Sequence, residues 1–357
     1  MKRVLVTGAG GSASIGFTRC LKIAPEKMFT VGTECNEKFV FNSETDVKIL
    51  APPAKSPSYV DVLNEIIEKY DLGFLHVQPD VEVGVLSENR QKIKCPMFLP
   101  SKVTINICQN KLESNRIWQE KSVPTGRTIF IGNKEDLKEA FDTIKPPLWV
   151  RAIKGAGGRG SLLVQKFEHA ENWIDYWSGW GNFIASEYLP GANCGWDAIF
   201  KDGDLIACQT KERLEYMLSR ASPSGITGTT AIAKSVNKKD VNKIAEDAVR
   251  AVDPKPHGVF SVDLKADKNG NFMVTEINPG RFLTSSLHFF YTAKNLMPYI
   301  YLKIAYNEKV PENILNQKTP EGTILIRSLD SKPITLQETK LKELIADREK
   351  NQYVVVE

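Results

Sequence analysis

Short apolar runs alternate with amphipathic stretches over the first hundred residues. The runs that predict strands lie at 4–6, 28–33, 73–77 and 97–100. Between them, 17–23 and the stripe at Leu63, Ile66, Ile67 and Tyr70 have the spacing of helices buried on one face. Strands that alternate with helices in this way form a parallel sheet, so we expect an N-terminal α/β domain.

The chain beyond residue 105 has a different pattern, with strand-like runs joined by tight turns. Asn110 and Asn133 precede two charged helical stretches, where N-cap residues belong. Lys201-Asp-Gly-Asp joins two apolar runs and predicts a β-hairpin. An amphipathic stripe over 239–252 and an aromatic-rich stretch over 285–306 predict further helices. This region is therefore expected to be of the α+β class.

Length and composition limit the classes of protein. A chain of 357 residues predicts two or three domains, and a net charge of +4 with scattered Lys and Arg gives no reason to expect nucleic acid as a partner. Six cysteines without Cys-x-x-Cys spacing and four unpaired histidines argue against a zinc site and for reduced thiols. No apolar run is long enough for a membrane span, and no signal peptide is visible. We expect a cytoplasmic protein.

Three oxygen-bearing side chains are predicted to meet in one hairpin. Asp263 lies in an apolar run, Lys268-Asn-Gly is turn-like, and Glu276 and Asn278 end the second run. Because side chains alternate along a strand, Glu276 and Asn278 share a face that the opposite strand can bring to Asp263. Hard oxygen ligands at one point suit Mg²⁺, with Mn²⁺ as the alternative ion. The competing interpretation is an exposed strand end before Pro279.

A glycine-rich loop at 155–161 separates two strand-like runs. Its backbone N–H groups could cover phosphates, while Arg151 and Lys154 would supply positive charge. It is not a Walker loop, because no Gly-Lys-Ser/Thr ends it and no helix follows. The alternative is a glycine-rich hairpin loop that happens to carry basic residues.

A second glycine-rich turn, Gly8-x-Gly10-x-x-Ala13, follows the first strand and fits a relaxed dinucleotide fingerprint. Glu34 ends the next strand, where an acid would bind the ribose. These residues support a rival hypothesis, an NAD(P)-dependent oxidoreductase. Glycine-rich first turns also occur in many α/β sheets that bind no dinucleotide.

Two acids follow the strand at 73–77. Asp80 and Glu82 lie just beyond its carboxyl end, where open α/β sheets bind ligands, so either could bind a substrate amine or hydroxyl. The alternative for each is a solvated loop residue.

Four motifs follow one another along the chain: the glycine-rich loop, Glu187-Tyr-Leu-Pro-Gly, Lys201-Asp-Gly, and Asp263 followed by Glu276-Ile-Asn-Pro. In this order and rough spacing they resemble the ATP-grasp superfamily, most closely a single synthetase unit of the carbamoyl phosphate synthetase large-subunit type. The resemblance covers about residues 110 to 305. It implies a Rossmann-like domain at 1–105, an ATP-grasp domain at 106–310 with lobes at about 106–186 and 187–310, and a C-terminal extension at 311–357.

The resemblance also implies roles for individual residues. Lys111 and Arg151 would bind ATP phosphates, and the loop with Lys154, Gly157, Gly158 and Ser161 would cover them. Glu187 and the backbone at Leu189 resemble the adenine-reading hinge. Asn193 stands where the family usually has a ribose-binding glutamate. Asp263, Glu276 and Asn278 match metal positions, and Arg281, with Gly280 interrupting the usual Asn-Pro-Arg, resembles the arginine that holds the transferring phosphoryl group. Asn278 and Arg281 are thus the catalytic candidates.

The segment 211–230 is similar to one that lines the acceptor side in these synthetases. Arg220 could pair there with a substrate carboxylate, or it could be a solvated loop residue. The resulting hypothesis is an ATP- and Mg²⁺-dependent ligase that joins a small-molecule carboxylate to an amine. Its rivals are the NAD(P)-dependent oxidoreductase and a nucleotide-binding sensor without turnover. The C-terminal extension could dock on the ATP-binding lobes or form a homodimer.

Overall fold

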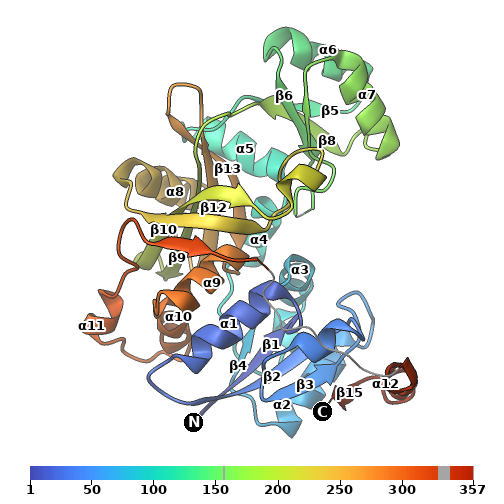
Figure 1. Ribbon diagram of the computed structural model, residues 1–357, viewed down its shortest axis with the longest axis vertical. Helices are drawn as coiled ribbons and strands as arrows, with labels where there is room; N and C mark the ends of the chain where they lie inside the picture. The colour runs from blue at the N-terminus through green and yellow to red at the C-terminus, as the bar shows by residue number, and fades with distance from the viewer. Residues whose placement is uncertain (156, 329–337, 357) are drawn as a thin grey trace.

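The computed structural model describes residues 1–155, 157–328 and 338–356. Figure 1 shows three parts: an N-terminal α/β layer, a large sheet above it, and a small lobe at the far end. The predicted combination of a parallel-sheet domain and an α+β region is confirmed. None of the helices in the described ranges combines the length and apolar character that a membrane crossing would require.

The N-terminal sheet has the strand order β15-β3-β2-β1-β4. Strands β1 (Lys2–Thr7), β2 (Met28–Glu34), β3 (Val47–Leu50) and β4 (Phe74–His76) are parallel neighbours. Helices α1 (Ser12–Lys22), α2 (Tyr59–Lys69) and α3 (Asp80–Glu88) belong to this part, with 3-10 turns at Phe39–Asn42 and Arg90–Lys92. The apolar stripe of α2 is buried as predicted. The strand predicted at 97–100 is wrong, because those residues pair with no strand of the described structure. The neighbouring Pro96 carbonyl accepts one backbone bond, from Leu75 N.

The small lobe is a four-stranded sheet, ordered β5-β8-β6-β7, that packs against two helices. Its elements are β5 (Thr128–Ile131), α6 (Lys134–Thr143), β6 (Leu148–Ala152), β7 (Leu162–Val164), α7 (Phe167–Tyr176) and β8 (Phe183–Glu187). A capping box between Asn133 and Asp136 begins α6, as the sequence predicted for Asn133. Apolar side chains of the sheet and both helices form a core of their own. The glycine-rich loop lies between the antiparallel strands β6 and β7.

The large sheet has the order β13-β12-β9-β10-β11-β14. Its strands are β9 (Asn193–Lys201), β10 (Asp204–Tyr216), β11 (Thr230–Val236), β12 (Gly258–Ala266), β13 (Phe272–Pro279) and β14 (Ile324–Ile326). A 3-10 turn at Ser219–Ala221 lies between β10 and β11. Helices α4 (Lys102–Cys108), α5 (Lys111–Glu120) and α8 (Lys239–Val252) lie on one side, where the α8 stripe joins the core with Trp118 and Trp196. This buried stripe confirms the amphipathic helix predicted over 239–252.

Helices α9 (Thr284–Thr292) and α10 (Met297–Ala305) join the large sheet to the N-terminal layer. One core contains Phe17 of α1, Phe74 of β4, Phe290 of α9 and Tyr301 of α10. The predicted helical pair is thus confirmed, with Pro298 in the first turn of the second helix, where proline is tolerated. This shared core holds α1 and α9 side by side (Figure 1).

The C-terminal part returns to the start of the chain. After α11 (Glu312–Leu315), β14 closes the edge of the large sheet, and α12 (Glu338–Asn351) leads to β15 (Val354–Val356). Strand β15 pairs antiparallel with β3, so the extension contributes strands to both large and N-terminal sheets. Figure 1 shows α12 and β15 beside the N-terminal layer. The division into domains at 105 and 310 stays a prediction.

Candidate functional site

A cavity of about 370 Å³ lies between the small lobe and the large sheet. Elements from both sides line it, namely α5, β6, the glycine-rich loop, the segment after β8, and strands β10, β12 and β13. Seven lysine and arginine side chains and three acids contribute to the lining: Lys111, Arg151, Lys154, Arg159, Arg213, Lys265, Arg281, Glu187, Asp263 and Glu276. The excess of positive charge makes the cavity suited to a polyanion.

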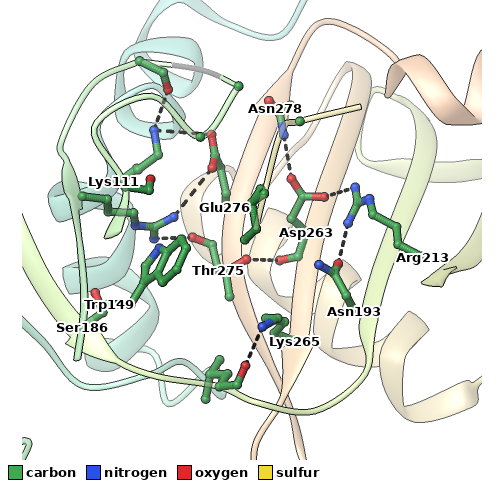
Figure 2. A pocket seen from close by; sticks show the side chains of 18 of the residues that line it. Lys111, Trp149, Ser186, Asn193, Arg213, Asp263, Lys265, Thr275, Glu276 and Asn278 are labelled. Atoms are coloured by element: carbon green, nitrogen blue, oxygen red, sulfur yellow. Dashed lines mark hydrogen bonds and ion pairs between the residues drawn. The ribbon is translucent and has the colours of Figure 1, made fainter. Parts of the chain in front are cut away.

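The hairpin of β12 and β13 places the predicted oxygen donors together. Asp263 stands opposite Glu276 in the register, and Ser261 stands opposite Asn278. A register irregularity follows Asp263 immediately, which is a place where a bulge can turn a side chain toward a site. The Asn278 amide donates to Asp263 Oδ2 over 3.2 Å. The predicted hairpin is therefore confirmed, and Asp263, Glu276 and Asn278 do meet at the cavity (Figure 2).

Both acids of this hairpin are paired with cations. Glu276 lies 3.4 Å from Lys111 Nζ and 3.7 Å from the Arg151 guanidinium. Asp263 forms an ion pair with Arg213. Burial opposes the charge of Arg213, yet the adjacent Asp263 carboxylate raises the pKa of that guanidinium. Figure 2 shows the two acids between these cations.

Lys111 and Arg151 come from two different elements, α5 and β6, and both face Glu276. Asn110 caps α5, as predicted, and so fixes Lys111 in its first turn. Lys111 Nζ also donates to the Gly155 carbonyl over 2.8 Å. Arg151 donates to the Thr275 carbonyl over 2.9 Å, while its buried Nε has no partner among the described residues. Burial lowers the pKa of Arg151, and Glu276 opposes that shift.

The glycine-rich loop covers the cavity from the small-lobe side. Gly157 and Gly158 have positive φ angles of 71° and 72°, a conformation that suits glycine. A Cβ on Gly158 would lie 2.9 Å from the Ile226 carbonyl oxygen, so the loop touches the segment between β10 and β11. Lys154 and Ser161 also line the cavity, as the sequence predicted. Residue 156 lies outside the described part of the loop.

The predicted hinge runs along one wall. Glu187, at the end of β8, and Leu189 both line the cavity. Lys265 donates to the Leu189 carbonyl over 2.7 Å, and burial lowers the pKa of this lysine. Asn193 begins β9; its amide nitrogen donates to the Tyr216 hydroxyl over 2.9 Å, and its Oδ1 accepts from Arg213 over 2.7 Å. The predicted hinge and Asn193 thus lie on the cavity wall.

Arg281 and one of the two predicted N-terminal acids lie at the cavity. Arg281 lines the cavity, donates to Asn278 Oδ1, and lies 3.4 Å from Asp80 Oδ1, so Asp80 reaches the edge of the site. Glu82 instead points into the N-terminal layer, where burial raises the pKa of its carboxyl to about 7. Arg220 is exposed in the 3-10 turn and is absent from the lining. The structure therefore brings neither Glu82 nor Arg220 to the cavity.

Sequence analysis did not single out three polar lining residues that contact the proposed site residues. Arg213 and Tyr216 lie on β10, and Lys265 lies on β12. Lys265 could have been found, because it is two residues from Asp263 along a strand. The sequence gives less indication that Arg213 contacts Asp263, because the strand of Arg213 is separated from that of Asp263 by β9.

Comparisons with known proteins agree with this architecture. Residues 108–285 match the family model of the ATP-grasp domain. A probable alpha-L-glutamate ligase of Alkalilimnicola ehrlichii is 24% identical over 184 residues, which are 50% of this chain and 58% of that protein. The chain thus spans little more than half the length of this curated relative.

Two solved structures have the same arrangement of domains. The ATP complex of carboxyaminoimidazole ribonucleotide synthase from Aspergillus clavatus superposes with a TM-score of 0.66 and 14% identity, covering 91% of this chain and 81% of that one. An L-amino acid ligase from Bacillus licheniformis gives a TM-score of 0.62 at 13% identity, covering 88% and 74%. At this identity the likeness concerns the fold. The family match identifies residues 108–285 of this chain as an ATP-grasp domain.

Proposed function

We propose that this protein is an ATP- and Mg²⁺-dependent ligase that activates a small-molecule carboxylate as an acyl phosphate and joins it to an amine. One observation carries the proposal: in an ATP-grasp domain, Asp263, Glu276 and Asn278 meet Lys111 and Arg151 beneath a glycine-rich loop. Phosphoryl transfer requires positioning and charge neutralisation above all, and this cavity offers both.

The donor set fits a magnesium ion. Two carboxylates and one amide oxygen are hard ligands, and Mg²⁺ takes few protein ligands, leaving positions for water and phosphate oxygens. The described ranges contain no group of three or more His, Cys, Asp or Glu side chains that could hold a metal ion. When bound, the ion would neutralise charge on the phosphates. Asp263, Glu276 and Asn278 are the residues that would hold it.

The proposed reaction has two steps. A carboxylate oxygen of the substrate attacks the γ-phosphorus of ATP, ADP leaves, and an acyl phosphate forms. The amine nitrogen then attacks the acyl carbon, phosphate leaves, and the nitrogen loses a proton. Lys111, Arg151 and Arg281 would neutralise the phosphate oxygens during transfer, and the loop with Lys154 and Ser161 would exclude water.

The nucleoside would lie along the hinge in this proposal. Glu187 and the Leu189 backbone are placed at the wall where a base could bind, with Asn193 further along for the ribose. Two relatives are named as glutamate and amino acid ligases, which supports a small carboxylate and an amine as the substrate pair. A homodimer and a cytoplasmic location remain part of the proposal; all six cysteines are free thiols.

The geometry gives no support to the oxidoreductase alternative. A Cβ on Gly10 would lie 2.0 Å from the Phe39 carbonyl oxygen, so the protein's own backbone fills the approach to the first glycine-rich turn. The Glu34 carboxylate accepts from Gly10 N over 3.1 Å instead of facing an open ribose site.

A thermal-shift titration tests the proposal, with ATP, ADP, NAD⁺ and NADP⁺, each with and without Mg²⁺. Ligand that binds only the native state raises the melting temperature. We expect a Mg²⁺-dependent shift with ATP and ADP, followed by ADP release when carboxylate and amine pairs are screened. A shift with NAD⁺ or NADP⁺ alone would transfer the active site to the first turn and refute the proposal.

A further inference from the structure

Every proposed metal ligand is already in contact with a donor of the protein. Asp263 Oδ1 pairs with Arg213, and its Oδ2 accepts from the Asn278 amide. Glu276 faces two cations, and the Asn278 oxygen accepts from Arg281. Three cations thus pair with the two carboxylates, and a fourth, Arg281, bonds the amide. A free divalent cation entering here would have to break these contacts against a positive local charge.

Arg213 occupies a special position among the four. It lies on β10, whereas Asp263 lies on β12, and β9 runs between them. The side chain can cross because residue 195 of β9, paired with both Lys211 and Asp263, is a glycine. A Cβ on Gly195 would lie only 3.0 Å from the Arg213 guanidinium nitrogen. The lack of a side chain at Gly195 therefore leaves the space through which Arg213 reaches Asp263.

Arg213 also binds β9, the strand that its side chain crosses. Its second nitrogen donates to Asn193 Oδ1 over 2.7 Å and contacts the Cys194 carbonyl at 3.3 Å. Its side chain is only 7% exposed, so the ion pair with Asp263 is screened little by solvent. Arg213 therefore connects the residue proposed for the ribose with the residue proposed for the metal.

We infer that Arg213 is a positioning residue that holds Asp263 in place of the metal and keeps the site closed to a free divalent cation. The metal enters only together with a polyphosphate. Phosphate oxygens attract Lys111 and Arg151 away from Glu276, and the bound polyanion reverses the local charge that excludes the ion. Metal and nucleotide then bind with positive coupling, each raising the affinity for the other by the same factor. This inference rests on the proposed function.

Binding of Mn²⁺ alone tests the inference, with no nucleotide and no turnover. The sharp electron paramagnetic resonance signal of free Mn²⁺ is lost on binding, so it reports affinity directly. We expect weak binding to the wild-type protein and a gain in affinity of about tenfold or more for Arg213→Met, because a close charge pair competes with the ion.

Lys265→Met is the matched control. It removes one positive charge from the same cavity, two residues from Asp263, where the lysine donates to the Leu189 carbonyl rather than to either acid. The general loss of repulsion should change Mn²⁺ affinity by less than about threefold. An equal gain in both variants, or no gain in Arg213→Met, would overturn the inference.

A second variant covers the case in which Arg213→Met does not fold, which circular dichroism would show. Arg213→Lys keeps the charge but replaces the planar fork, whose two nitrogens bond Asn193 and Asp263 separately, with a single ammonium nitrogen. We expect an intermediate gain in Mn²⁺ affinity, and unchanged affinity would contradict the inference. Nucleotide binding measured in parallel separates the two hypotheses. A wild-type protein that binds no adenine nucleotide refutes the proposed function. A wild-type protein that binds Mn²⁺ tightly in the absence of nucleotide refutes only the role of Arg213.

Discussion

Asp80 of the N-terminal layer lies 3.4 Å from the guanidinium of Arg281 at the ATP-grasp cavity. The acid stands at the first position of α3, just after β4, so the carboxyl edge of the parallel sheet faces the site. The same arginine donates to Asn278, one of the proposed metal ligands. This contact connects the N-terminal layer to the proposed phosphoryl-transfer residues, so the N-terminal layer contributes a side chain to the edge of the site.

Asp80→Asn should lower the turnover of the proposed ligase by about tenfold, because Arg281 loses the partner that orients it. ATP affinity should hardly change, since Asp80 contacts neither Lys111 nor Arg151. Stability should fall by only about 0–1 kcal/mol, as expected for a partly exposed ion pair. Steady-state kinetics and a thermal melt measure both effects. Asp61→Asn, at an exposed acid on α2, is the control. Equal turnover in the two variants would contradict this role of Asp80.

Arg151→Ala should weaken ATP binding by about 1.5–3 kcal/mol, the range for a hydrogen bond to a charged group. The reason is that this buried guanidinium has a nitrogen without a partner in the described structure and faces the cavity. Calorimetric titration with ATP and Mg²⁺ measures the change. Arg116→Ala removes an exposed arginine on α5 that pairs only with Glu113 and Glu120, so it should leave ATP affinity unchanged.

Glu276→Ala should abolish Mg²⁺-dependent turnover while the protein stays folded. Loss of one carboxylate removes a proposed metal ligand and leaves Lys111 and Arg151 without their shared partner. ADP release with saturating substrates measures turnover, and circular dichroism checks the fold. Asp204→Asn, at an exposed acid next to the turn between β9 and β10, is the control. Turnover like that of the wild-type protein would remove Glu276 from the site.

The hairpin with Asp263 and Glu276 could be predicted from the sequence, because strand periodicity and a turn place both residues by local rules. The contact of Arg213 with Asp263 could not. It spans 50 residues and crosses a third strand, and it depends on a glycine whose importance appears only after the strands are paired. Local pattern therefore predicted the ligands but not the cation that holds one of them.

Asp80 and Glu82 show how an error in secondary structure misplaces a side chain. The sequence predicts that both lie just beyond the carboxyl end of the strand, where either could bind a ligand. The structure begins α3 at Asp80, and residues two apart on a helix point about 200° away from each other. Asp80 therefore faces Arg281, while Glu82 turns inward to Thr7 and Tyr59.

The buried carboxyl of Glu82 predicts a pH dependence of stability. Burial raises its pKa from the ordinary value of 4.5 to about 7, and the nearby hydroxyls of Thr7 and Tyr59 oppose the shift only in part. Between these two values the folded protein holds a proton that the unfolded chain has released. The free energy of unfolding should therefore fall as pH rises from about 4.5 to 7, by up to about 3 kcal/mol, and then level off.

Glu82→Gln isolates this contribution, because the amide resembles the protonated carboxyl and does not titrate. Urea unfolding at pH 5 and pH 7.5 should give the variant and the wild-type protein similar stability at the lower pH. At the higher pH the variant should be more stable, by roughly 1–3 kcal/mol, since it escapes the cost of a buried charge. Glu65→Gln, at an exposed position of α2, should leave the pH dependence of the wild-type protein intact. A variant at residue 82 that kept the full pH dependence would show that another group titrates.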